Sequence, residues 1–258
     1  MRKTASCPCL WPGLLMVLAC TAGAWELKSE KSLGTLPGGA TVWQRELVQN
    51  GQSLMLHGVS FRQADYHLRV VDVAPPAQAK LPAAAAAAGG VAGCNASYFH
   101  EDYRPLGLVI SGGEQIHALE RAKLLSGILA VRDEKPELVR PAAFKPGGSV
   151  TEAVQAGPWL VEAAGPVGGL DETKRARRTV VATDGRGRWA LIATSPASLS
   201  AAAAALASGQ AIPDWKPASA LNLDGGSSTA LWAANQPDPL TIPELGHVRN
   251  FLVIVPKD

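Results

Sequence analysis

Short alternating segments joined by tight turns constrain the fold of this chain more than any other feature. Asn50-Gly51 separates residues 42–48 from residues 53–61, and Asn-Gly is a strong signal for a two-residue hairpin turn. Residues 66–73 form a third alternating segment, and Asp184-Gly185 joins two more strand-like segments further along. Hairpins place antiparallel strands side by side, so the pattern predicts a largely antiparallel sheet.

Helix signals are few. The alanine run at residues 83–88 predicts a helix, with a low-complexity linker as the alternative, and Ser198 is a suitable N-cap for a helix over residues 199–207. Residues 150–156 fit either a helix or a strand. Strands and helices do not alternate regularly. We therefore expect an α+β fold, a single domain with a largely antiparallel or mixed sheet flanked by a few helices.

The first 24 residues have the pattern of a signal peptide. Arg2 and Lys3 precede an apolar run, and Ala22-Gly23-Ala24 is a small-residue cleavage site. Residues 17–20 also resemble a lipobox, which would make Cys20 a lipidated residue and the only link to a membrane. We expect a periplasmic or secreted domain over residues 25–258, with a polar lead-in before a core at about 42–256.

Charge and cysteine usage exclude several functions. Without the leader, basic and acidic residues are equal in number, 22 of each, which gives no support to nucleic-acid binding. Three of the four cysteines lie in the leader, so Cys94 has no intrachain partner; it fits a small buried side chain or, less well, a nucleophile. No His, Cys and Asp cluster has metal-ligand spacing, and we expect no metal and no cofactor.

The segment Asn222–Thr229 is the strongest candidate for a site. Asp224 is followed by two glycines and then by three hydroxyl residues. Glycines let a backbone approach a ligand closely, and amide and hydroxyl groups can donate to phosphate or sugar oxygens. The alternative is an ordinary turn between two strands, because Asp-Gly and Gly-Gly are common turn dipeptides.

Several short motifs, in chain order, resemble those of the phosphodiester glycosidase family. Ala96 replaces a usual glycine, Ala156 replaces a usual serine, and a glycine usual near Thr183 is missing. The motifs cover most of the chain after the leader: Asn95–Phe99, Pro105–Ile110, Ala156–Val161, Arg178-Thr179, Leu223–Ser228 and Val248–Asn250.

The resemblance implies hydrolysis of the bond between the anomeric carbon of a sugar and a phosphodiester. It implies that Arg178 binds the phosphate, where the alternative is a surface ion pair. It implies that Asp224 acts as general acid or base or as nucleophile, where the alternative is a turn cap. For a second carboxylate we expect Glu101, ahead of Asp102 and Glu162.

The remaining expected site residues bind the substrate, a sugar-1-phosphodiester or phosphorylated glycan. Asn95 can bond sugar hydroxyls or phosphate oxygens, or it can be an amide that stabilises a loop. A non-catalytic glycan- or phosphoglycan-binding protein of the cell envelope is the alternative function. The full binding set is Asn95, Tyr98, Gly107, Gly157, Thr179, Asn222, Gly225, Gly226, Ser227 and Ser228.

Overall fold

The computed structural model describes residues 23–75 and 79–257. The expected leader and the lipidation site at Cys20 therefore lie outside the described residues, apart from Gly23 and Ala24. None of the helices in the described ranges is long and apolar enough to cross a membrane.

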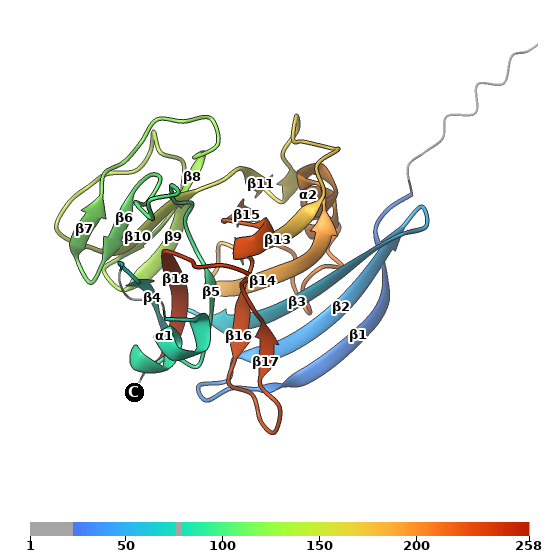
Figure 1. The fold of residues 1–258 in the computed structure, drawn as a ribbon. Helices are drawn as coiled ribbons and strands as arrows, with labels where there is room; N and C mark the ends of the chain where they lie inside the picture. The colour runs from blue at the N-terminus through green and yellow to red at the C-terminus, as the bar shows by residue number, and fades with distance from the viewer. Residues whose placement is uncertain (1–22, 76–78, 258) are drawn as a thin grey trace, which may run out of the picture.

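The fold is mostly β, so the expected α+β class is wrong. Three sheets with antiparallel strand pairs account for most of the structure, as Figure 1 shows. Within the described residues there are two α-helices, α1 (Leu81–Ala87) and α2 (Leu199–Ala207). The physical reason is that hairpins make most of the connections, while the two alanine runs are only about two turns long.

An eight-stranded sheet forms the larger half of the molecule. Its edge strand β1 covers most of the segment that we expected to be a polar lead-in; pairing with β2 orders it, although its side chains stay largely exposed. In order across the sheet the strands are β1 (Glu26–Thr35), β2 (Thr41–Gln49), β3 (Gln52–Arg62), β14 (Arg188–Ala197), β13 (Ala176–Thr183), β15 (Ser219–Asn222), β11 (Trp159–Glu162) and β12 (Gly165–Pro166).

Two five-stranded sheets lie against the large sheet (Figure 1). One has the order β7 (Glu114–His117), β6 (Val109–Ser111), β10 (Val150–Ala156), β8 (Gly127–Arg132) and β9 (Lys135–Val139). The other has the order β17 (Leu240–Ile242), β16 (Leu231–Ala233), β5 (Ala92–Asn95), β18 (Asn250–Pro256) and β4 (Tyr66–Asp72). The ambiguous segment 150–156 is thus a strand, because it pairs with β8 on one side and β6 on the other.

The largest hydrophobic cluster joins all three sheets. Leu191 of the large sheet, Val154 of β10 and Leu252 of β18 belong to it and are fully buried. Each such side chain contributes about 1.5–3 kcal/mol by leaving water. The cluster therefore fixes the three sheets relative to one another.

Helix α2 covers part of the opposite face of the large sheet. Leu206 of α2 packs in a second cluster with Leu160 and Ile192. Ser198 caps the helix as expected, since its hydroxyl accepts a hydrogen bond from the Ala201 amide at 3.1 Å. The start of α2 is thereby held beside the end of β14.

Candidate active site

Asn95 joins two sheets where β5, β13 and β15 meet. Its Oδ1 accepts hydrogen bonds from the Thr179 hydroxyl at 2.6 Å and from the Ala230 amide at 2.9 Å. Its Nδ2 donates to the Asp224 carbonyl at 2.7 Å. Asn95 and Thr179 are fully buried, so in this geometry both position the turn that follows β15.

A cavity of about 300 Å³ opens beside that turn. It brings together residues from six separate parts of the sequence, including Asp224 and Arg178. The expected site residues that line it are Tyr98, Arg178, Asn222, Asp224, Gly225 and Gly226.

Asp224 is the partly buried carboxylate of the cavity. Its Oδ1 accepts a hydrogen bond from the Gly225 amide at 2.8 Å. Burial raises the pKa of Asp224 to about 6, although bonds from Ser228 and the Gly225 amide act in the opposite direction. A carboxylate with that pKa is mainly ionised at neutral pH yet can accept and release a proton there, which suits general acid–base chemistry.

Arg178 is a buried cation rather than half of a surface ion pair. Its side chain donates from Nε to the Ala197 carbonyl at 3.0 Å and from Nη2 to the Lys174 carbonyl at 2.7 Å. No carboxylate of the described chain lies within ion-pair distance of it. Burial lowers the pKa of the guanidinium, while the nearby Tyr98 and Asp171 raise it. Nη1 remains without a hydrogen bond to any residue described, at the cavity that Arg178 lines.

Tyr98 and Asn222 form a polar wall with the carbonyl of Gly157. The Tyr98 hydroxyl donates to that carbonyl at 2.6 Å, and Asn222 Nδ2 donates to the same carbonyl at 2.9 Å and to the Tyr98 hydroxyl at 3.0 Å. Burial, followed by the charge of Asp224, raises the pKa of Tyr98, so its hydroxyl stays protonated. Asn222 Oδ1 is buried and has no donor among the described residues.

Gly157 is required by close packing rather than by ligand contact. A Cβ at this position would lie 2.0 Å from the carbonyl oxygen of Leu124. No side chain fits there without a shift of the backbone. Gly157 thereby lets its own carbonyl approach Tyr98 and Asn222.

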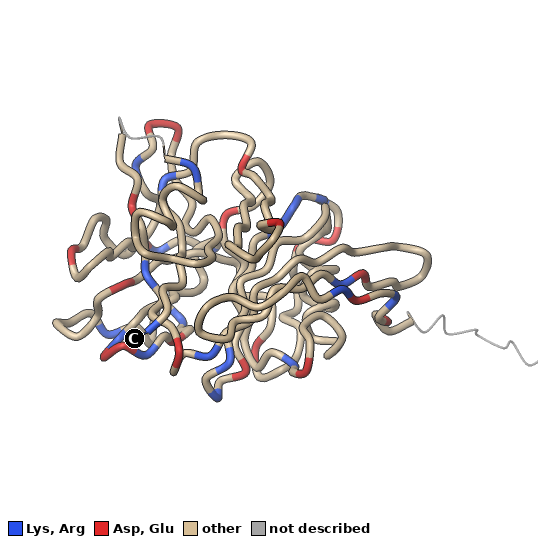
Figure 2. Tube along the Cα trace, turned by 90° about the horizontal axis from the view of Figure 1, so that it is seen from below, with Lys and Arg blue, Asp and Glu red and all other residues tan. Residues whose placement is uncertain are grey.

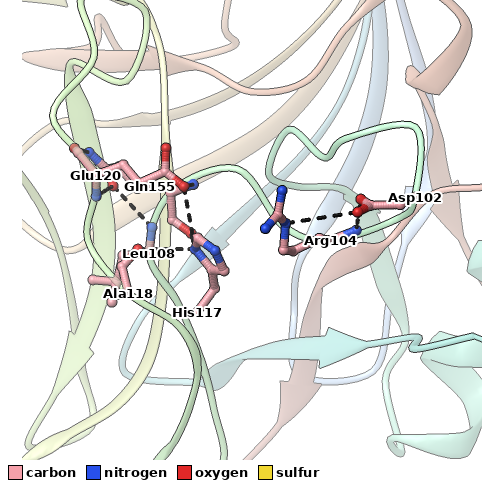
Figure 3. A network of polar contacts seen from close by, with 8 residues as sticks. Asp102, Arg104, Leu108, His117, Ala118, Glu120 and Gln155 are labelled. Carbon is pink, nitrogen blue, oxygen red and sulfur yellow. Dashed lines mark hydrogen bonds and ion pairs between the residues drawn. The ribbon is translucent and has the colours of Figure 1, made fainter.

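Gly107, Ser227 and Ser228 lie outside the lining of the cavity. Gly107 has a φ of +86°, and its carbonyl oxygen lies 3.0 Å from Nδ1 of His117. His117 and Gln155 belong to the polar network of Figure 3. Ser227 is exposed, and its carbonyl accepts a hydrogen bond from the Leu245 amide at 2.8 Å. Ser228 is buried in the short 3-10 helix η1 (Gly226–Ser228).

The three candidates for a second carboxylate also lie outside this lining. Glu101 and Asp102 are exposed in a turn, where Asp102 accepts a hydrogen bond from the Arg104 amide at 3.1 Å (Figure 3). Glu162 pairs with Arg140 at 2.7 Å. The structure does not bring any of the three to Asp224.

Sequence reasoning missed two charged residues that line the cavity, Asp171 and Lys174. The basic run at residues 174–178 was a visible signal, but a solvated loop is its usual explanation. Asp171 is about 50 residues from Asp224 in sequence, and no local pattern connects the two.

Known proteins place the chain in a family and a fold. The model of the family described as phosphodiester glycosidase matches residues 88–255, well over half of the chain. No curated protein sequence matches. The similar solved structures share the fold at low sequence identity.

One similar structure is the catalytic domain of zebrafish N-acetylglucosamine-1-phosphodiester alpha-N-acetylglucosaminidase, auto-inhibited by its pro-peptide. The two structures superpose with a TM-score of 0.62 at 14% sequence identity, and the match covers 88% of this chain and 87% of that one. A hypothetical protein from Synechocystis has a TM-score of 0.58 and 17% identity, over 90% and 68% of the two chains. A candidate exported protein from Burkholderia pseudomallei has a TM-score of 0.56 and 13% identity, over 80% and 74%. The family match, over residues that include Asn95, Arg178 and Asp224, shows that this chain belongs to the phosphodiester glycosidase family.

Proposed function

We propose that this protein is an exported hydrolase that cleaves the bond between a sugar anomeric carbon and a phosphodiester in envelope or extracellular glycans. The observation that carries the proposal is the convergence of Arg178 and Asp224 on one small cavity in a chain of this family. A buried cation suits the phosphate, and a carboxylate with a pKa near 6 suits the anomeric carbon.

In the proposed reaction, Arg178 binds the phosphate through Nη1 and stabilises the charge that the leaving group gains. Ionised Asp224 takes a proton from a water molecule whose oxygen forms the new bond to the anomeric carbon. The bond from that carbon to the phosphate oxygen breaks, and the phosphate monoester leaves with the bonding electron pair. Attack by Asp224 itself, followed by hydrolysis of the glycosyl-enzyme, is the other version of the same chemistry.

A phosphate leaving group reduces the need for a second carboxylate. Most glycosidases use one carboxylic acid to protonate a poor leaving group. A phosphate monoester is already a good one, so a site with one buried carboxylate is sufficient for this substrate class. The exposed position of Glu101 is compatible with that chemistry.

Sugar hydroxyls have a suitable wall in the cavity. Asn222 Oδ1 is a buried acceptor with no donor in residues 23–75 and 79–257, and a buried acceptor left unpaired costs about 1–3 kcal/mol. A hydroxyl group of the ligand, directly or through one water, would satisfy it. The Gly225 amide is not free to donate to a phosphate or sugar oxygen, because it already donates to Asp224.

One observation favours the alternative, a non-catalytic glycan- or phosphoglycan-binding protein. Ala96, which stands where the family usually has glycine, lies directly at the site: its carbonyl accepts a hydrogen bond from the Asp224 amide at 2.9 Å. The departure from the family pattern therefore touches the residue proposed to act on the substrate.

Turnover and binding measured on the same compounds decide between the two functions. Purified protein is incubated with a panel of sugar-1-phosphodiesters that differ in the sugar, and release of the free sugar is followed. In parallel, calorimetry measures binding of each compound. We expect release of sugar from at least one compound. Binding without release, at enzyme concentrations that would reveal a single turnover, would establish the binding protein instead.

A further inference from the structure

The basic side chains of the run Lys174–Arg178 make different contacts in the structure. Arg175 is exposed and donates to the Pro196 carbonyl at 2.8 Å, away from the cavity lining. Arg177 donates to the carbonyls of Gly226 and Pro243 at 3.1 and 3.3 Å, behind the Asp224 turn. Lys174 and Arg178 line the cavity. The run is therefore more than a solvated basic loop.

The backbone of Lys174 is held on both sides. Its amide donates to Asp171 Oδ1 at 2.8 Å, and its carbonyl accepts the bond from Arg178 Nη2 at 2.7 Å. The Asp171 carbonyl in turn accepts a bond from the Ser200 amide of α2 at 3.1 Å. The side chain of Lys174 thus starts from an ordered turn at the mouth of the cavity.

Asp171 binds the backbone of this turn and, among the residues that the structure describes, makes no ion pair with the ammonium of Lys174. Asp171 Oδ1 accepts bonds from the amides of Lys174 and Thr173 and from the Thr173 hydroxyl, which hold the pKa of the carboxyl below its usual value. No hydrogen bond or ion pair joins Lys174 Nζ to another residue in the described ranges. Basic and acidic residues are interspersed along the trace elsewhere (Figure 2).

Arg178 alone offers an incomplete phosphate site. Two of its five N–H groups already donate to protein carbonyls, one from Nε to Ala197 and one from Nη2 to Lys174. The side of the guanidinium formed by Nε and Nη2 therefore already binds the protein, whereas a phosphodiester presents two unesterified oxygens that share one negative charge. Lys174 is the other cation that lines the same cavity, and it can supply a further donor to these oxygens.

We propose that Lys174 is a specificity-determining residue, the second cation of the phosphate subsite, and that it makes the site select anionic sugar-1-phosphodiesters over neutral glycosides of the same sugar. This inference rests on the proposed function of the Asp224 cavity. Lysine acts there as a flexible point charge beside the fixed guanidinium of Arg178.

Three variants test the assignment. Lys174→Gln removes the positive charge, whereas Lys174→Arg keeps it. Arg175→Gln removes a charge from the same run at a residue outside the cavity lining, and it is the control. Calorimetry or NMR titration with inorganic phosphate measures the subsite without turnover. We expect about 10-fold weaker phosphate binding for Lys174→Gln, equal to about 1.4 kcal/mol, near wild-type binding for Lys174→Arg, and no change for Arg175→Gln. Lys174→Gln is also expected to flatten the salt dependence of binding.

Kinetics then separate charge selection from a general defect. For a turned-over sugar-1-phosphodiester, Lys174→Gln is expected to raise KM with kcat nearly unchanged, while affinity for the free sugar stays the same. Equal loss for phosphate and for the free sugar would show a general disturbance of the site and would overturn the proposal. Unchanged phosphate affinity in Lys174→Gln, or no phosphate binding by the wild type, would overturn it as well.

The results also distinguish this proposal from the proposed function. If the wild type turns over the diester and Lys174→Gln has no effect, the proposed function stands and the role of Lys174 as second cation is refuted. If phosphate binding depends on Lys174 but the wild type never releases sugar, the role of Lys174 stands and the proposed hydrolase activity is refuted.

Discussion

Two acidic turns of the molecule differ in what surrounds them. Asp224 follows β15 beneath the carbonyl of Ala96, is partly buried and shares a cavity with Arg178. Glu101 and Asp102 lie in an exposed turn between β5 and β6, where Arg104 and Asp102 approach to only 4.0 Å. Both turns carry carboxylates and a nearby arginine. Burial raises the pKa of Asp224 to about 6, whereas solvent surrounds the other pair.

The two turns contain the same types of residue, so the convergence of separate chain segments is what makes one of them a candidate site. Asp224 is held by Asn95 of β5 through its carbonyl, and Asn95 is held in turn by Thr179 of β13. The 100–104 turn is closed mainly by its own backbone, with Tyr103 donating to the His100 carbonyl and His100 donating to the Arg104 carbonyl, each at 2.8 Å. Four substitutions and a pH series test this difference between the two turns.

The largest effect is expected for Asp224→Asn. Asn keeps the size of the side chain and can still accept the bond from the Gly225 amide, so the turn survives. It cannot act as a base, and we expect kcat to fall by about 10² or more. Initial rates on an authenticated sugar-1-phosphodiester measure this, with thermal unfolding as the control for folding. A wild-type rate would refute the catalytic role.

Arg178→Lys is expected to lower kcat/KM by about 10-fold or more and also to destabilise the protein. Lysine cannot serve the carbonyls of Ala197 and Lys174 together, and an unpaired buried carbonyl costs about 1–3 kcal/mol. The matched control is Arg104→Lys in the exposed turn, where the ion pair contributes about 0–1 kcal/mol. Urea unfolding and kinetics on both variants test the difference; equal effects would remove the contrast between the two regions.

A smaller change in activity is expected across the pH range in which Asp224 titrates. If the ionised carboxylate acts, kcat/KM should be about half of its maximum at about pH 6, reach a plateau above about pH 7 and be about 10-fold below the plateau near pH 5. A pH–rate profile on the wild type checks this. A profile that rises toward acid would instead assign Asp224 as a general acid.

The same pKa has a consequence for stability with a defined sign. The folded-state pKa of about 6 is above the model value of 3.8, so the folded protein holds the proton more tightly than the unfolded chain. Ionised Asp224 then destabilises the fold above about pH 6, and this cost vanishes below about pH 4. We expect Asp224→Asn to be more stable than the wild type at pH 7, by about 3 kcal/mol at most; urea unfolding at pH 4 and pH 7 shows whether the gain depends on pH.

Glu101→Gln should have the smallest effect. The side chain is exposed and outside the cavity lining, so we expect kcat/KM to stay within about twofold of the wild type and stability within about 0.5 kcal/mol. The assay is the one used for Asp224→Asn. A loss comparable to that of Asp224→Asn would mean that the 100–104 turn closes over the substrate, and Glu101 would return as the second carboxylate.

Local chemistry determined much of the secondary structure in advance. Asn50-Gly51 forms the expected hairpin turn, with φ of +48° and +76°, and Ser198 caps α2 through its own hydroxyl. Such signals depend on a few neighbouring residues. The strand β1 was missed because its polar sequence becomes a strand only through its pairing with β2, and the balance of strand to helix was misjudged because two short alanine helices add little to three sheets.

Short motifs identify the family, because their order survives substitutions such as Ala96, and they also point to Asp224 and Arg178. Which charged groups meet cannot be read from the motifs, because it depends on the packing of the sheets. The fold places Asp224, Arg178 and Lys174 on one cavity and leaves Glu101 in solvent. Burial and electrostatic interaction depend on distance in space. Here that distance is set by two sheets, in which β5 lies beside β13 and β15 although it precedes both by more than 80 residues in the chain.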